Sequence, residues 1–94
     1  MTTNALPSPD EAAVTALRAM AWLARDEERF SRFCQLTGMD AASLRDAAAD
    51  SGAQVAVLDY LLADETLLLV FVSDEGLPPG APRLARMRLG GEDI

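Results

Sequence analysis

Two adjacent pairs of carboxylates, Asp26-Glu27 and Asp64-Glu65, are the residues of this sequence that most resemble a reactive centre. Paired carboxylates can carry out acid–base catalysis or hold a divalent cation. Neighbouring residues on a helix do not face each other, however. Each pair also stands where a helix begins, and a helix start favours oxygen acceptors and negative charge. We therefore interpret both pairs as helix caps and predict no catalytic residue in them.

Cys34 is the only cysteine of the chain, and histidine is absent. A reactive thiolate needs a neighbouring base or cation, and a free cysteine between Phe33 and Leu36 is typical of a protein core. The sequence has no phosphate-binding glycine loop and no His/Cys spacing of a metal site. It therefore predicts a non-enzymatic protein without catalytic, cofactor-binding or metal-binding residues, in a cytoplasm where a lone cysteine stays reduced.

Trp22 and Tyr60 are the residues best suited to binding a partner, and both fall outside the main apolar stripe of their segment. Tryptophan and tyrosine dominate the energetic hot spots of protein interfaces. The alternative is that each ring packs over the turn onto a neighbouring helix, since large aromatic side chains seldom stay exposed in a small domain. We favour the packing alternative and keep Trp22 and Tyr60 as candidate interaction residues.

Basic side chains gather near the C-terminus, at Arg83, Arg86 and Arg88. Arg83 and Arg86 are candidates for meeting an acidic partner or a phosphate, although such residues more often form a solvated face. The segment 35–48, QLTGMDAASLRDAA, has the pattern of a helix-turn-helix. Its second helix carries aspartates, whose charge is wrong for binding a phosphate-lined groove. The alternative is a tight helix–helix corner that does not bind DNA.

The 94 residues make one small domain with a formal net charge of −7. This charge repels phosphate backbones and anionic membranes, so it disfavours nonspecific nucleic-acid binding and favours either solubility or a basic partner. No secretion signal is present, and the longest apolar run, LLLVFV at 67–72, is too short to span a bilayer as a helix. We expect a soluble cytoplasmic protein that has a protein partner or self-associates.

Helix start and stop signals divide residues 8–90 into five or six short helices, with flexible tails expected at 1–7 and 91–94. The sequence SPDE at 8–11 is a capping box with proline at the first helical position. Glycines at 38 and 76 are placed to end helices in the left-handed conformation. The expected helices span 9–25, 27–37, 40–49, 53–62, 65–75 and 81–89.

Hydrophobic periodicity predicts which face of each helix is buried. In the segment 9–25, the residues predicted to face inward are Ala13, Val14, Leu17, Met20, Ala21 and Ala24. The middle of the segment 65–75 is apolar all round, so we expect it to be buried on most sides. Asp59 interrupts the apolar run of 53–62, where we expect it to lie at the helix flank and pair with an arginine.

The two halves of the chain match each other when they are shifted by 38 residues. The matching pairs include Leu23 and Leu61, Asp26 and Asp64, Phe33 and Phe71, and Gly38 and Gly76. Each half reads as a helix, an acidic cap, a second helix, a glycine and a short helix. The sequence therefore predicts an all-α fold, a compact bundle made of two pseudo-repeated three-helix units, which are too few for a solenoid.

The run ALRAMAWLARDEERFSRFCQLTG, together with VLDYLLADETLLLVF and GLPP, resembles the domain-of-unknown-function family 3572. That family consists of small bacterial proteins found mainly in alphaproteobacteria. The resemblance covers about residues 12–88. It implies a helical, cytoplasmic protein, and it brings no catalytic or binding residues with it.

Three functions are compatible with these observations. The first is a non-enzymatic interaction or regulatory module that self-associates through 53–62 and 65–75, because a small domain has little interior to hide so apolar a segment. The second is a helix-turn-helix-like regulator that uses 35–48 or the arginine-bearing last helix. The third is a binder of an apolar small molecule or lipid, with a pocket between the two halves.

Overall fold

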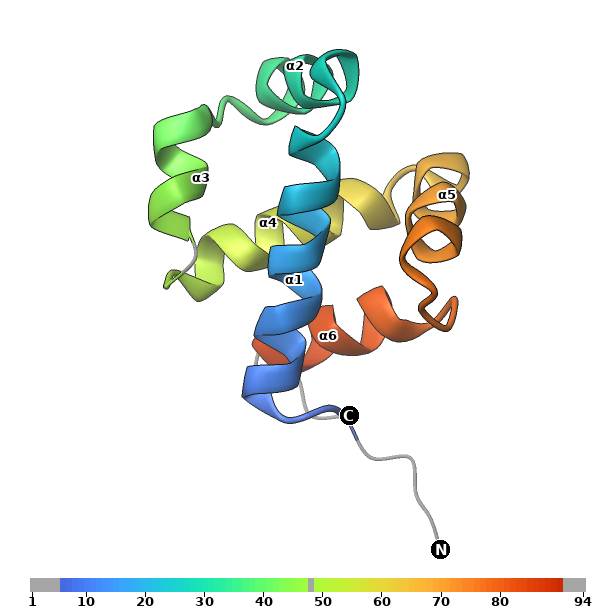
Figure 1. Cartoon of the computed structure of the whole chain (residues 1–94). Helices are drawn as coiled ribbons and strands as arrows, with labels where there is room; N and C mark the ends of the chain where they lie inside the picture. The colour runs from blue at the N-terminus through green and yellow to red at the C-terminus, as the bar shows by residue number, and fades with distance from the viewer. Residues whose placement is uncertain (1–5, 48, 91–94) are drawn as a thin grey trace, which may run out of the picture.

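The computed structural model describes residues 6–47 and 49–90, and within these ranges the chain is built from α-helices and contains no strand (Figure 1). The predicted all-α fold class is therefore confirmed. The helices are α1 (Pro9–Ala24), α2 (Glu27–Thr37), α3 (Ala41–Ala47), α4 (Ser51–Leu62), α5 (Glu65–Glu75) and α6 (Ala81–Leu89). The predicted tail at 91–94 and most of the tail at 1–7 lie outside the described residues.

The two acidic pairs are helix caps, as predicted. The Asp26 side chain accepts hydrogen bonds from the backbone N–H groups of Glu28 and Arg29, at 3.0 and 3.2 Å. The Asp64 side chain accepts one from the Leu67 N–H at 3.2 Å. These bonds satisfy amide donors that a helix start leaves without an intrahelical partner. The two carboxylates are thus committed to local structure.

Helix α4 begins two residues earlier than the sequence predicted. Asp50 caps it by accepting a hydrogen bond from the Gly52 N–H at 2.9 Å. Because this cap lies before the glycine, Ser51 and Gly52 belong to the helix and not to the preceding loop. The left-handed helix ends are found where expected, at Gly38 with φ 78° and at Gly76 with φ 67°.

Helix α1 lies at the centre of the fold (Figure 1). Helix α6 packs extensively on both α1 and α4, and α1 also packs on α4. Helices α3 and α5 make smaller interfaces with α4. The main core lies where α1, α2, α4 and α5 meet, and its largest fully buried side chains are Trp22, Leu23, Phe33, Val57, Leu61 and Phe71.

The predicted inward face of α1 is only partly correct: Met20 is buried, and Leu17 is half-buried against the main core. The helix buries a different row of residues, Ala12, Ala16, Ala19 and Leu23, each fully inaccessible to solvent. Val14 is 53% exposed, and Ala21 and Ala24 are also exposed. The reason is that alanine side chains allow close helix contact: Ala12 and Ala16 form a second core cluster with Leu58 of α4 and Ala85 of α6.

The expectation that α5 is buried on most sides is also wrong. Of its apolar residues only Phe71 and Val72 are buried, whereas Leu69 is 49% and Val70 is 43% exposed. Helix α5 lies at the edge of the fold, where its backbone runs close to α4 and its Phe71 side chain packs on Trp22 of α1. One face of the helix is therefore left open to solvent.

Candidate interaction site

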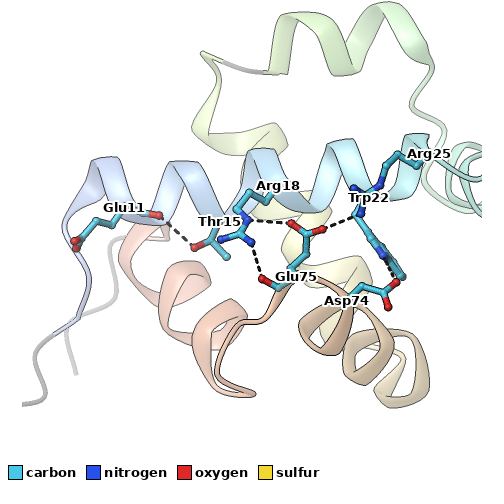
Figure 2. Close-up of polar contacts among 7 residues, drawn as sticks. All are labelled: Glu11, Thr15, Arg18, Trp22, Arg25, Asp74 and Glu75. Carbon is cyan, nitrogen blue, oxygen red and sulfur yellow. Dashed lines mark hydrogen bonds and ion pairs between the residues drawn. The ribbon is translucent and has the colours of Figure 1, made fainter.

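Trp22 is 1% exposed, so it packs inside the fold and offers no surface to a partner. Its ring makes an edge-to-face contact with Phe71 of α5, with ring centroids 5.4 Å apart. The Arg29 guanidinium lies over the ring, with its carbon 3.7 Å from the ring centroid, in a cation–π contact. The indole Nε1–H donates a hydrogen bond to Asp74 Oδ2 at 2.8 Å (Figure 2). The packing that the sequence favoured for Trp22 is thus confirmed, and the alternative of an exposed hot spot is wrong.

Tyr60 is half-buried and makes the corresponding edge-to-face contact with Phe33, at 4.9 Å between centroids. Trp22 and Tyr60 are 38 residues apart, and so are Phe33 and Phe71. The aromatic residue of each half therefore packs on the equivalent phenylalanine of the other half. A two-fold relation between two duplicated units would produce this reciprocal pairing, and the repeat itself stays a prediction.

The two arginine candidates have different surroundings. Arg86 Nε donates to Asp59 Oδ1 at 2.8 Å, an ion pair that links α6 to α4 and gives Asp59 the arginine partner expected for it. Arg83 is exposed and forms no ion pair with the residues at 6–47 and 49–90. Arg86 therefore has a structural role, and only Arg83 is presented to solvent.

A cluster of polar side chains ties the end of α5 to α1 (Figure 2). Arg18 Nε donates to Glu75 Oε1 at 3.0 Å, and Arg18 Nη2 donates to the Glu75 backbone oxygen at 2.7 Å. Arg25 Nη2 binds Glu75 Oε2 at 2.8 Å. Together with the bond between Trp22 and Asp74, these contacts form what we call the α1–α5 clamp. Both carboxylates of the clamp are engaged, so neither is free for acid–base chemistry.

A signal for the clamp was present in the sequence. Asp74 and Glu75 occupy the last turn of α5, where the helix dipole disfavours negative charge. Carboxylates at that position indicate a cationic partner outside the helix. Sequence reasoning missed Arg18 and Arg25 in this role because the partners are 50 residues or more away along the chain.

The clamp makes stability depend on pH. Its two arginines lower the pKa of Glu75 below the ordinary value of 4.5, first through their hydrogen bonds. A carboxyl with a lowered folded-state pKa stabilises the fold above its unfolded pKa, and this contribution is lost as the pH falls through the folded pKa. We expect Glu75→Gln to lower the melting temperature at neutral pH and to approach the unmodified protein below pH 4.5.

Thermal unfolding followed by circular dichroism across the acid range measures this effect. Glu28→Gln is the matched control, because it removes the same charge from an exposed residue that forms no ion pair with the described part of the chain. A Glu75→Gln deficit that stays constant through the acid range would show that the clamp does not depend on the ionised carboxylate.

An apolar groove lies between α1, the start of α2 and α3. One hollow of about 490 Å³ is lined by Leu17, Met20, Ala21, Ala24, Phe30, Ala41, Leu44 and Arg45. A neighbouring hollow of about 650 Å³ is lined by Glu27, Glu28, Phe30, Ser31, Cys34, Asp40 and Ala41. The two share Phe30 and Ala41, so they form one surface, which we call the α1–α3 groove. It is apolar at the α1 end and acidic at the α2–α3 end.

The groove is open because α3 does not close onto α1. Helix α6, the counterpart of α3 in the second half of the chain, packs on both α1 and α4. Helix α3, by contrast, packs substantially on α4 alone and stands apart from α1 (Figure 1). Leu44 is the only large apolar residue of α3. The short helix therefore has little apolar surface with which to cover Leu17, Ala21 and Ala24.

The corner at 35–48 forms as a helix, a turn at Gly38 and a second helix, with Ala48 outside the described residues. Asp40, which directly precedes α3, and Asp46, within α3, are both exposed. The Asp40 pKa is lowered, chiefly by the hydrogen bond from the Ser43 backbone, so Asp40 stays ionised at neutral pH. Cys34 is half-buried at the core edge and lines the groove, which is less burial than the sequence led us to expect.

The model of a protein family, described as proteins of unknown function (DUF3572), matches residues 9–92. The chain belongs to this family. The match spans all the helices of this DUF3572 protein, including every residue that lines the α1–α3 groove. No curated protein and no solved structure matches the chain.

Across residues 6–47 and 49–90, no cluster of three or more His, Cys, Asp or Glu side chains is arranged to hold a metal ion. In the same part of the chain, no helix is long and apolar enough to cross a membrane.

Proposed function

We propose that this DUF3572 protein is a non-enzymatic interaction module whose α1–α3 groove receives a helix of another protein. The observation that supports the proposal is the second apolar face of α1. Leu17, Ala21 and Ala24 form a stripe with helical spacing along one wall of the groove, where Leu17 is half-buried and Ala21 and Ala24 are exposed. The reducing cytoplasm is the compartment that we propose, because the chain's single cysteine is free.

The form of the groove favours a helix over the other candidates. Apolar small molecules bind in cavities that bury most of their surface, but Ala21, Ala24 and Ala41 on the groove wall are all exposed to solvent. Nucleic acid is disfavoured by the carboxylates at the other end. A helix laid in an open groove needs only one apolar face and leaves its other faces in water.

Site-specific photo-crosslinking tests the proposal in cells that produce the protein. A benzophenone amino acid at position 24 places the reactive group in the groove, and the same residue at position 63 is the control. Ala63 is also an exposed alanine next to a helix end, and it does not line the groove. We expect a discrete protein adduct from position 24 that position 63 does not give. Identical adduct patterns, or none from position 24, would contradict the proposal.

A further inference from the structure

We infer that the segment received by the α1–α3 groove is a basic amphipathic helix, an inference that rests on the proposed function. The first observation is the charge at one end of the groove. Glu27 and Glu28 lie in the first turn of α2, and Asp40 precedes α3; all three are exposed and line the same hollow. None of them forms an ion pair with the residues that the structure describes. Their charge is available to a cationic partner.

The second observation is the apolar wall that continues from this acidic end. Leu17, Phe30 and Leu44 are half-buried, come from three different helices and face one hollow. A helix with apolar residues at i, i+3, i+4 and i+7 presents a stripe that matches such a wall. Lysines or arginines at one end of this helix would then reach Glu27, Glu28 and Asp40.

The charge of the whole chain decides between a basic partner and a second copy. Each chain carries a net charge of −7, so two copies repel each other on approach, whereas a basic segment is attracted. Arg45, the one basic residue on the groove wall, lies at the α3 side of the apolar hollow and leaves the three carboxylates in excess.

Two synthetic peptides of about four helical turns test the inference. Both carry leucines at i, i+3, i+4 and i+7 spacing; one has lysines at the remaining positions, and the other has glutamates. We expect the lysine peptide to bind at least about tenfold more tightly by fluorescence anisotropy, and added salt to weaken it. Cys34 lines the acidic end, so a bound lysine peptide is expected to slow alkylation of Cys34 severalfold.

Matched variants locate the binding. The double variant Glu27→Gln, Glu28→Gln removes two of the three carboxylates at the acidic end of the groove. The control variant Asp10→Asn, Glu65→Gln removes the same charge from exposed residues at other helix starts. Likewise, Ala24→Arg blocks the groove, and Ala63→Arg adds the same side chain elsewhere. We expect the two groove variants to weaken the lysine peptide at least about tenfold, and each control to weaken it less than about twofold.

Several results would overturn the inference. These are equal affinity for the two peptides, equal effects of the two double variants, or full Cys34 reactivity at saturating lysine peptide. A crosslink from position 24 to a second copy of this chain would overturn it as well. If position 24 crosslinks to another protein but the lysine peptide fails to bind, the basic helix is refuted and the proposed function stands. If both experiments fail, both are refuted.

Discussion

Replacing Trp22 by alanine is expected to lower the free energy of unfolding by about 3–5 kcal/mol. The ring is 1% exposed and contacts Phe71, and it is the largest side chain in the core. Its removal leaves a cavity at the contact between α1 and α5. It also removes the indole N–H that donates a hydrogen bond to Asp74. A domain of this size has roughly 5–14 kcal/mol of stability in total, so the loss is a large part of it.

Urea unfolding followed by far-UV circular dichroism measures this effect, since the variant lacks the chain's only tryptophan. Trp22→Phe is the control: it keeps an aromatic ring against Phe71 and removes the indole N–H. Because Asp74 is exposed and water can replace the lost donor, we expect this variant to be clearly more stable than Trp22→Ala. A cost below about 1 kcal/mol for Trp22→Ala would contradict the buried position of the ring.

Placing aspartate at Ala16 is expected to cost about 3 kcal/mol or more, because the charge would be buried without a partner. Ala16 is fully buried among Ala12, Leu58 and Ala85, where α1 meets α4 and α6. Ala21 lies on the same helix but is exposed. Ala21→Asp is therefore expected to cost only the lower helix propensity of aspartate and the unfavourable placement of a negative charge in the last turn of α1, together about 1–2 kcal/mol.

The two aspartate variants share composition, charge and helix, so the difference in their unfolding free energies reports chiefly burial. The helix dipole acts against aspartate at position 21, which makes the expected difference a lower bound on the effect of burial. Chemical denaturation provides the comparison, with one m-value, the slope of unfolding free energy against denaturant concentration, used for both variants. The hydrophobic pattern of the sequence predicts the opposite order, because it assigns Ala21 to the buried face. Ala21→Asp as the more damaging of the two would show that the stripe of Leu17, Ala21 and Ala24 is covered in the folded protein.

The sequence by itself determined where most of the helices begin and end. Ser8, Asp26 and Asp64 cap helices because their side chains bond to amides two or three residues away. Gly38 and Gly76 end helices because each adopts a left-handed backbone conformation, a local property that glycine permits. Such interactions depend on neighbours along the chain, and a single sequence contains all of them. The same local signals predict the all-α fold class.

Tertiary structure alone decided which surfaces are covered. Helix α1 has two apolar faces, and the pattern in the sequence favoured the face with larger side chains. The fold buries the alanine face instead, since small side chains let α4 and α6 come closest there. Trp22 is buried because Phe71 and Asp74, some 50 residues away, meet its ring and its N–H. The α1–α3 groove exists for the same reason: α3 packs on α4 and leaves the second face of α1 open.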